Sequence, residues 1–469
     1  MGSEGNDRGD GSIMSGLSEK KVSRRDFLKV GAAAGAALGM GGVLGTALTA
    51  CGSSGSSSGG SSSGGSGREI KVGFVTPLTG AIASFGIPDA WCVKQWEAAV
   101  KDGVKCGDGQ THPVKIIVKD TQSDTNRAAQ VTGDLITNDG CDIIMAASTA
   151  DTVPPVADTC EAMQVPCVTN DCPWQAYFFG RGGDPAKGFE WTYHSWWGLE
   201  GITATFVSMW DSLKTNKKIA EMWPNDGDGL AWANAKTGQP PVLTKGGYTI
   251  IDGGRYQDLT DDYSSQIAKF KSADAQILSG VMLPPDFTNF WKQSLQQGFN
   301  PIIATVGKAL LFPQSLEALG DIGYNLSSEC WWSPNHPFKS SLTGQTCQQI
   351  ADQYEKDTNS QWTQPILHYA IFEVVVNALQ RTTNVDDKAT IRDAIKATDM
   401  QTIGGEVSWK NAPPAGPATK LNPVPNVCTT PITGGQWVKG DKYPYNLIVV
   451  NNSQASEVPT QGKLQPLTY

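Results

Sequence analysis

The stretch from Asp142 to Trp174 reads DIIMAASTADTVPPVADTCEAMQVPCVTNDCPW. Its two short apolar runs, Asp142–Ala147 and Val165–Asn170, are flanked by turn residues and predict buried strands. The segment between them has the length of a helix, and it predicts a polar turn at Ser148–Thr152 followed by a helix over Val153–Gln164. Strand, helix and strand in this order are typical of a βαβ unit with parallel strands.

Polar residues follow both predicted strands, at the edge where an open α/β sheet binds its ligands. Ser148 and Thr149 follow the first predicted strand. Asn170 ends the second one, and Asp171 follows it. A helix that begins just past Ser148 and Thr149 presents backbone N–H groups and the positive end of its dipole, which favours an anion. The same hydroxyls, together with Thr152, are also ordinary helix-capping residues, so the pattern leaves a purely structural role open.

The N-terminal region predicts export and lipid attachment. Residues 1–50 are interpreted as a signal peptide, because Ser23–Lys29 reads SRRDFLK, a twin-arginine motif, and the Gly/Ala run after it is too weakly apolar for a retained membrane helix. Leu48–Cys51 (LTAC) resembles a bacterial lipobox, which makes Cys51 the predicted lipidation site. Residues 51–67 consist of Cys51 and a Gly/Ser linker, a composition that is typical of a flexible tether. We therefore expect a body that is lipid-anchored at the outer face of the cytoplasmic membrane.

The remaining chain, about 400 residues, is too long for one compact core and predicts two lobes. Strands and helices alternate up to the opening unit, and the alternation restarts at Thr203. Two such series are typical of an α/β protein with two doubly wound lobes. We expect lobe 1 to comprise residues 68–190 and 306–400, and lobe 2 to comprise residues 191–305 and 401–469.

Charge and cysteine content narrow the possible partners. The formal net charge is −9 and no basic run is present, which argues against nucleic acid and against an electrostatic attraction to anionic lipid.

In an exported chain the cysteines other than Cys51 favour disulfides over zinc ligands, with the pairing left open. They stand at positions 92, 106, 141, 160, 167, 172, 330, 347 and 428.

Catalytic and metal-binding motifs are missing from the sequence. The G-x-S-x-G matches, such as Gly55–Gly59, lie in the low-complexity linker and carry no meaning there. There is no H-E-x-x-H or P-loop motif, and the four His are not paired at metal-ligand spacing. The sequence therefore predicts no enzyme, no metal and no cofactor.

Several motifs recur in a fixed order between Ile70 and about Asn411. They are KVGFVTPLTG at Lys71–Gly80 with Phe85-Gly86, Asp120 with Asn126–Ala129, the opening unit up to Pro166, the turn Asp226–Leu230, and Ala275–Gly298. In this order they resemble the motifs of the branched-chain amino acid solute-binding proteins of ABC importers, which are type I periplasmic binding proteins. The resemblance implies two lobes joined by a three-strand hinge, which close on a small ligand.

The resemblance also implies roles for individual residues. Ser148 and Thr149 fall where the family grips the α-carboxylate of its ligand. Asn170 and Asp171 fall at the adjacent strand end, which contacts the ammonium and carboxylate. Phe85 falls where an aromatic ring covers the ligand's side chain.

Two departures from the family pattern bear on the ligand. Asp226 replaces the usual aromatic residue of its turn, and no clear acid follows the predicted strand Ala275–Met282. Asp226 or Asp286 is therefore the candidate partner of a ligand ammonium, and a ligand without an ammonium group is the alternative. Fifteen Trp residues also suggest a cleft lined with rings that could stack a flat ligand, with Tyr193 and Trp332 as candidate cleft residues. Core packing is the alternative role for these rings.

The function expected from these features is capture of an amino acid or a related carboxylate, aromatic carboxylates included. The expected partners are an ABC permease with its ATPase, and the receptor is expected to be a monomer. A sensing module of the same fold that works with a signalling receptor is the alternative. An extracellular hydrolase is less well supported, because no catalytic set can be assembled.

Overall fold

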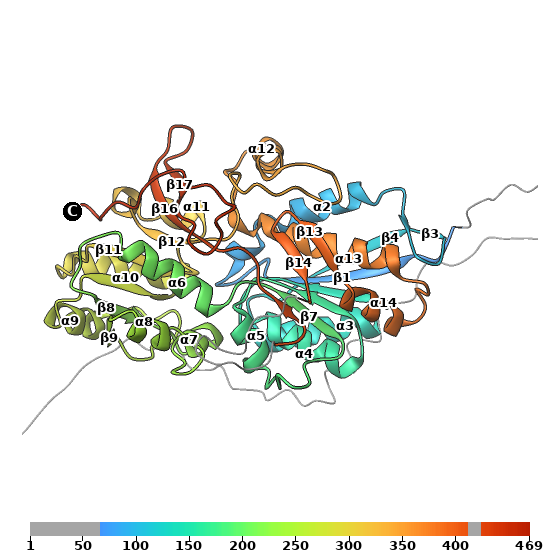
Figure 1. Cartoon of the computed structure of the whole chain (residues 1–469), viewed down its shortest axis with the longest axis horizontal. Helices are drawn as coiled ribbons and strands as arrows, with labels where there is room; N and C mark the ends of the chain where they lie inside the picture. The colour runs from blue at the N-terminus through green and yellow to red at the C-terminus, as the bar shows by residue number, and fades with distance from the viewer. Residues whose placement is uncertain (1–65, 411–423) are drawn as a thin grey trace, which may run out of the picture. The chain divides into compact units, whose positions relative to one another are not determined.

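The computed structural model describes residues 66–410 and 424–469, which belong to one compact unit of the chain (Figure 1). Their strands form two large sheets and two small two-stranded ones. None of the helices within these two ranges is long and apolar enough to span a membrane. The predicted signal peptide, Cys51 and nearly all of the linker lie outside the described residues.

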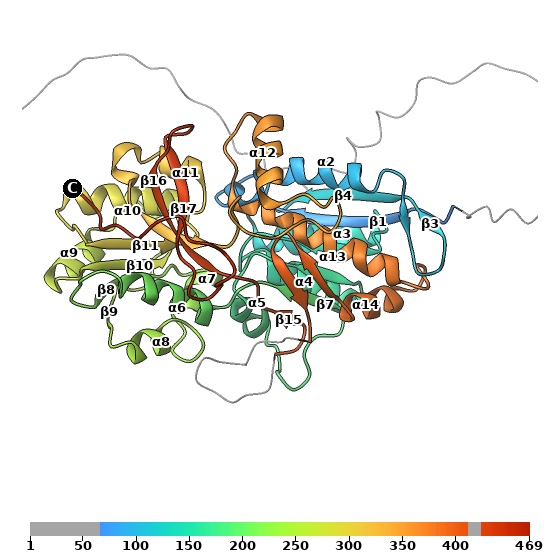
Figure 2. The same cartoon turned by 45° about the horizontal axis from the view of Figure 1, so that its top comes forward.

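The first large sheet is entirely parallel and has the order β15-β7-β6-β5-β1-β4. Figure 2 shows β15, from near the end of the chain, beside β7. The strands are β1 (Ile70–Thr76), β4 (Val114–Asp120), β5 (Ile143–Ala146), β6 (Cys167–Thr169), β7 (Thr192–Ser195) and β15 (Val427–Cys428).

The predicted βαβ unit is confirmed at the centre of this sheet. All four residues of β5 are buried, and β5 pairs in parallel with both β1 and β6. Helix α4 (Val153–Met163) connects β5 to β6; Pro154–Pro155 fit its first turn, where a missing N–H costs little. The helix ends at Gln164, whose φ of 56° is left-handed, as is common at a helix C-terminus.

Helices pack in pairs against the strands of the first sheet. Helix α3 begins after Asp124, whose side chain accepts a hydrogen bond from the Arg127 N–H, and it buries Ala128, Val131 and Leu135 along one stripe. Helices α3 and α4 contact each other, as do α2 and α13. The helices of this lobe are α2 (Asp89–Ala99), α3 (Thr125–Thr137), α4, α5 (Trp174–Gly180), α12 (Cys347–Thr358), α13 (Tyr369–Arg381) and α14 (Lys388–Lys396).

The second large sheet has the order β17-β16-β12-β11-β10-β8-β9 and is parallel except at β16 and β17, which pair antiparallel. Its strands are β8 (Lys218–Met222), β9 (Thr249–Asp252), β10 (Ile277–Val281), β11 (Ile303–Gly307), β12 (Ser327–Cys330), β16 (Thr433–Lys439) and β17 (Tyr445–Asn451). Its helices are α6 (Leu199–Trp210), α7 (Gly227–Trp232), α8 (Pro240–Lys245), α9 (Ser264–Ser272), α10 (Pro284–Gln296) and α11 (Pro313–Glu317).

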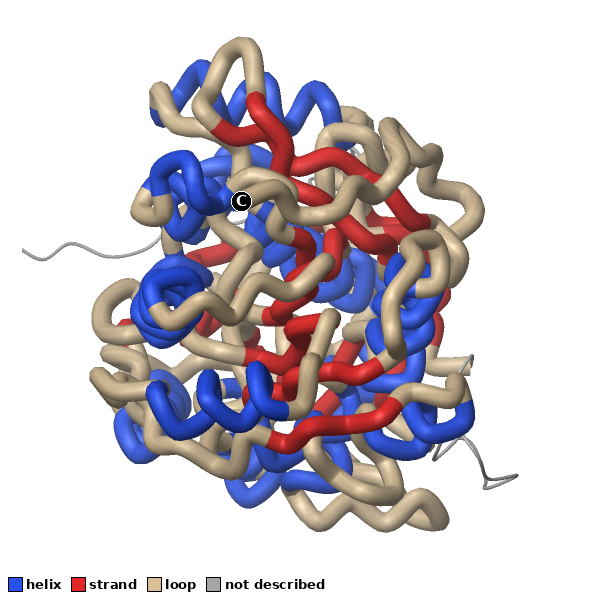
Figure 3. The backbone as a smooth tube through the Cα atoms, turned by 90° about the vertical axis from the view of Figure 1, so that its left-hand side faces the viewer, coloured by secondary structure: helices blue, strands red, loops and turns tan. Residues whose placement is uncertain are grey.

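Short elements complete the fold, and Figure 3 shows the strands running between helices. These elements are the pairs β2 (Val104–Lys105) with β3 (Thr111–His112) and β13 (Asp399–Thr402) with β14 (Gly405–Ser408), and the 3₁₀ turns η1 (Ala83–Gly86), η2 (Gly320–Gly323) and η3 (Gln364–His368).

The chain passes between the two large sheets three times, after β7, after β12 and after β15, through segments without regular structure. The expected lobe boundaries are wrong at these points. Strand β7 and strand β15 were expected in lobe 2, but they extend the first sheet, because β7 continues the parallel register of β6. Strand β12 was expected in lobe 1, but it pairs with β11 and β16 of the second sheet.

The disulfides expected among the cysteines are not formed in this structure. All nine cysteines from Cys92 to Cys428 lie among the described residues, and each is a free, buried thiol. Burial raises the pKa of the Cys92 thiol well above its usual range, so this thiol stays protonated at neutral pH. The nine side chains act as small apolar residues of the cores.

Candidate functional site

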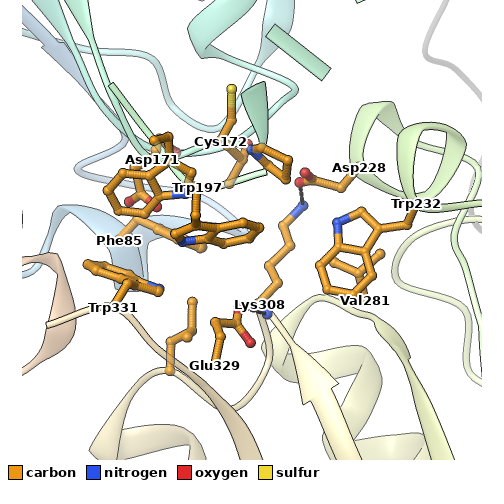
Figure 4. Close-up of a pocket in the computed structure, with 15 residues that line it drawn as sticks. Phe85, Asp171, Cys172, Trp197, Asp228, Trp232, Val281, Lys308, Glu329 and Trp331 are labelled. Carbon is orange, nitrogen blue, oxygen red and sulfur yellow. Dashed lines mark hydrogen bonds and ion pairs between the residues drawn. The ribbon is translucent and has the colours of Figure 1, made fainter. Parts of the chain in front are cut away.

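A pocket with an empty volume of about 310 Å³ lies at the carboxyl ends of strands from both large sheets (Figure 4). Parallel α/β sheets place their ligand sites at this edge. The lining residues come from both lobes and from the segments that cross between them. They are Phe85, Ser148, Thr149, Asp171, Cys172, Pro173, Trp196, Trp197, Asp228, Trp232, Val281, Lys308, Leu311, Glu329 and Trp331.

The turn before α4 brings Ser148 and Thr149 into the pocket, but the helix end supplies fewer amide donors than expected. Pro154–Pro155 have no N–H, and the N–H groups of Thr152 and Val153 donate to the Thr149 carbonyl at 3.2 and 3.0 Å. No side chain caps α4, and the buried Ser148 hydroxyl has no partner among the described residues. The Ser148 side chain therefore remains available to a ligand.

Four tryptophans give the pocket apolar walls that carry hydrogen-bond donors. Trp196, Trp197, Trp232 and Trp331 are all buried, and within the described parts of the chain none of their indole N–H groups meets an acceptor. Figure 4 shows the indole nitrogens of Trp232 and Trp331 facing the middle of the pocket. Because an indole nitrogen can only donate, these walls match a ligand that carries acceptor atoms.

Packing fixes the orientation of these rings. Trp196 contacts Trp331 edge to face, with 4.8 Å between ring centroids. Trp232 lies so close to β11 that a Cβ on Gly307 would meet its ring at 2.7 Å, so this position requires glycine. Phe85 packs edge to face on Phe312 at 4.9 Å.

On the first-lobe side of the pocket, Asp171 belongs to a buried charge relay. Nε2 of His368 lies 2.8 Å from Asp171 Oδ2, and Nδ1 lies 2.7 Å from Asp89 Oδ1. The Thr76 hydroxyl donates to the other oxygen of Asp89. Burial by itself would lower the pKa of His368, but the two carboxylates outweigh burial and raise that pKa to about 9. His368 is therefore an imidazolium at neutral pH.

On the second-lobe side, Lys308 extends into the pocket wall and meets three carboxylates. Its Nζ lies 2.9 Å from Asp228 Oδ2, 3.3 Å from Asp226 Oδ2 and 3.5 Å from Asp151 Oδ2. Burial alone would lower the pKa of Lys308, but the carboxylates raise it well above its usual value. Asp151 follows β5 of the first sheet, so this ion pair joins the two lobes.

Backbone strain and burial mark the same two places. Asp171 and Lys308 each follow a strand with a left-handed φ, of 63° and 65°, which costs a residue with a side chain about 1–3 kcal/mol. Burial raises the pKa of Asp171 to about 6, and that of Glu329, beside Lys308, to about 7. The fold therefore fixes the backbone at Asp171 and Lys308, and burial disfavours the charged forms of Asp171 and Glu329.

Phe85, Ser148, Thr149 and Asp171, of the residues proposed from the sequence, line this pocket. Asn170 is buried next to Asp171 but does not line it. The sequence analysis did not single out Lys308 or the four tryptophans that line the pocket. Lys308 follows a predicted strand, as Asp171 does. Its place at the carboxyl end of a strand was the one sign in the sequence that it could face a ligand.

Two acids expected to face a ligand ammonium are engaged elsewhere, which corrects their expected position. Asp226 caps α7, accepting from the Gly229 N–H at 2.6 Å, and its other oxygen pairs with Lys308. Both oxygens of Asp286 accept from the Leu259 N–H, at 2.9 and 3.1 Å, and hold a neighbouring loop.

Tyr193 and Trp332 were expected in the cleft, and both expectations are corrected. Tyr193 points to another surface hollow and packs on Trp409, with 5.3 Å between ring centroids. Trp332 packs against Trp362 at 6.0 Å, while the preceding Trp331 lines the pocket. Trp331 and Trp332 follow β12 in a segment without regular structure, so no local pattern in the sequence showed which of the two rings faces the pocket.

Two α/β lobes that enclose a pocket at their strand ends define the type I periplasmic binding fold. The model of the family described as periplasmic binding protein matches residues 69–419, and the chain belongs to this family. Residues 21–41 match the twin-arginine translocation signal, which marks the chain for export. A comparison with curated proteins finds no match.

Solved structures share this fold at low sequence identity. The leucine-binding protein of Thermotoga maritima is 15% identical, with a TM-score of 0.64 over 82% of this chain and 99% of its own. A branched-chain amino acid binding protein of Streptococcus pneumoniae, in complex with isoleucine, is 15% identical, with a TM-score of 0.61 over 81% and 99%. A solute-binding protein of R. palustris, in complex with 4-hydroxybenzoate, is 17% identical, with a TM-score of 0.65 over 83% and 99%.

Proposed function

We propose that this chain is a lipid-anchored solute-binding protein of an ABC importer, which captures a small carboxylate between its lobes and delivers it to the permease. The observation that carries the proposal is a set of buried donors in one pocket that meet no acceptor in the described ranges 66–410 and 424–469: the Ser148 hydroxyl and the indole N–H groups of Trp196, Trp197, Trp232 and Trp331. A buried donor left unpaired costs about 1–3 kcal/mol. A ligand that brings carboxylate oxygens recovers this free energy when it binds.

The ring-lined walls favour a carboxylate on a flat apolar group. Two structures of this fold were solved with such acids, 4-hydroxybenzoate and 3,4-dihydroxybenzoic acid, and one was solved with isoleucine. An amino acid also brings an ammonium group, which needs a buried carboxylate partner. The carboxyls of the pocket are already engaged: Asp228 holds Lys308, and Asp171 holds His368. The two oxygens of Glu329 accept from the Lys308 N–H and the Ser328 hydroxyl. The pocket therefore favours an acid without an ammonium group over an amino acid.

The N-terminal sequence supports the proposed place of action. The twin-arginine signal at residues 21–41 directs export, and the LTAC motif that ends at Cys51 offers a thiol for lipid attachment. The Gly/Ser linker that follows gives the binding body freedom to reach a permease in the same membrane.

Paired tryptophan variants test the proposed ligand class. Trp331→Phe keeps a ring in the pocket and removes one N–H donor, whereas Trp332→Phe makes the same change outside it. Isothermal titration with benzoate and 4-hydroxybenzoate should show binding to the parent chain. Trp331→Phe should weaken that binding by about 1.5–3 kcal/mol, roughly 10- to 100-fold, because hydrogen bonds to a charged acceptor have this strength. Trp332→Phe should bind as the parent does.

The same titrations with leucine and isoleucine complete the test. A parent chain that binds these amino acids and neither benzoate would show that the proposed ligand class is wrong. Equal losses in Trp331→Phe and Trp332→Phe would show that the indole donors of the pocket do not bind the ligand.

A further inference from the structure

We propose that Lys308 sets the specificity of the site by acting as a tethered substitute for a ligand's ammonium group. This inference rests on the proposed function, because it concerns which solutes the same pocket accepts. The chain's own cation occupies the acidic subsite, so solutes that carry an ammonium group are excluded. Removing the lysine side chain should therefore create an amine-binding site.

The contacts of Lys308 are those of a fully coordinated ammonium group. An ammonium has three N–H donors, and Nζ has three carboxylate oxygens within 3.5 Å, from Asp151, Asp226 and Asp228. The side chains of Lys308, Asp226 and Asp228 are only 4%, 5% and 6% exposed. Little solvent competes for the contacts of Lys308 to Asp226 and Asp228.

The surrounding charge is also suited to a cation. Three carboxylates face one lysine, so the cluster has a formal charge of −2 if all are ionised. The carboxylate oxygens of Asp151, Asp226 and Asp228 lie within 4.8 Å of one another, around the space that Nζ fills. One oxygen of the neighbouring Asp258 is buried and has no partner within residues 66–410 and 424–469.

The backbone keeps Lys308 in this position. It follows β11 directly, with a left-handed φ of 65°, and its N–H donates to Glu329 Oε1 at 3.2 Å. A group tethered in this way competes at an effective concentration in the millimolar range or above. A free amine at micromolar concentration cannot displace it.

The test replaces Lys308 with methionine in the full exported chain, since methionine keeps an unbranched apolar stem and lacks the charge. The probes are ethylammonium chloride, leucine and sodium benzoate, and the readout is the melting temperature at increasing probe concentration. We expect ethylammonium and leucine to stabilise Lys308→Met at concentrations at least 10-fold lower than those needed with the parent chain. Lys245→Met, at an exposed position in the last turn of α8, is the matched control and should behave as the parent does.

A second variant covers the case in which three unpaired carboxylates prevent folding. Lys308→Met with Asp228→Asn removes one charge of each sign and so keeps the formal charge of the cluster. Failure of both variants to respond to ethylammonium and leucine would overturn the proposal. Stabilisation by calcium but by neither amine would also overturn it, because the vacated space would then not be an ammonium site.

The two proposals can fail separately. If benzoates do not bind the parent chain but ethylammonium stabilises Lys308→Met, the proposed ligand class is wrong and the role of Lys308 stands. If benzoates bind the parent and no amine stabilises either variant, the proposed function stands and the inference about Lys308 is wrong.

Discussion

His368 and Lys308 are two buried cations on opposite sides of one pocket, and their partners differ in where they come from. His368 lies between Asp89 and Asp171, and all three residues belong to the first lobe. Lys308 pairs with Asp226 and Asp228 of its own lobe and with Asp151 of the other lobe. Both cations place a charged carboxylate at the pocket wall. Only the ion-pair cluster of Lys308 includes a contact between the two lobes.

The difference suggests a division of roles between the two charge clusters. The His368 relay stabilises one lobe whether or not the lobes are closed, because its ion pairs and hydrogen bonds among the described residues all lie within the first lobe. The Lys308 cluster includes a contact to Asp151, whose side chain is 26% exposed, so this contact is weaker and more easily broken. The first cluster is thus expected to affect folding, and the second to affect closure and specificity.

The largest expected effect is the loss of stability in His368→Gln. Removing the imidazolium leaves Asp89 and Asp171 buried without their cation, which costs about 3–5 kcal/mol. His336→Gln is the matched control: His336 is also buried but pairs with the Ser333 hydroxyl, and burial lowers its pKa to about 3, so it is neutral. Urea unfolding should show a clearly larger loss for His368→Gln. Similar losses in both variants would mean that the relay adds no more than ordinary packing.

A smaller effect is expected from pH. The pKa of His368 is about 9 in the folded chain and about 6.5 in an unfolded one, so its contribution to stability is complete below pH 6.5 and is lost as the pH rises through 9. Asp171, with a pKa raised to about 6, changes its contribution only below that pH. The difference in unfolding free energy between the parent chain and His368→Gln should therefore shrink between pH 6.5 and 9.5, by up to about 3 kcal/mol. A constant difference across this range would contradict a protonated His368.

The smallest effect on stability is expected for Asp151→Asn. This variant tests whether the contact between Asp151 and Lys308 holds the two lobes together. Asparagine keeps the oxygen that accepts from the Gly227 N–H at 3.0 Å, but it removes the charge that faces Lys308. We expect a loss of about 1 kcal/mol or less. Small-angle scattering without ligand should nevertheless show a larger radius of gyration than for the parent chain, since a link between the lobes is weakened.

Asp158→Asn is the control for this prediction, because Asp158 pairs with Arg181 within the first lobe. Its radius of gyration should equal that of the parent chain. If Asp151→Asn also leaves the scattering profile unchanged, Lys308 does not link the lobes in solution.

Local sequence patterns determined much of the fold and the edge at which the site lies. The apolar run of β5, the paired prolines of α4 and the polar residues after each strand act over a few positions, so they can be read without a structure. For that reason Ser148, Thr149 and Asp171 could be proposed as pocket residues. The export signal was equally local, and its family model matches residues 21–41.

Only the tertiary structure decided what fills the site and which rings face it. The choice of Trp331 over Trp332 is made in the irregular segment that follows β12, and the membership of β12 in the second sheet depends on its pairing with β11 and β16. The three carboxylates around Lys308 come from two places far apart in the sequence, Asp151 after β5 and Asp226 with Asp228 at the start of α7, and no local pattern shows that they converge on one ammonium. Charge pairing in a buried pocket depends on distances between distant segments, and packing of the two lobes sets those distances.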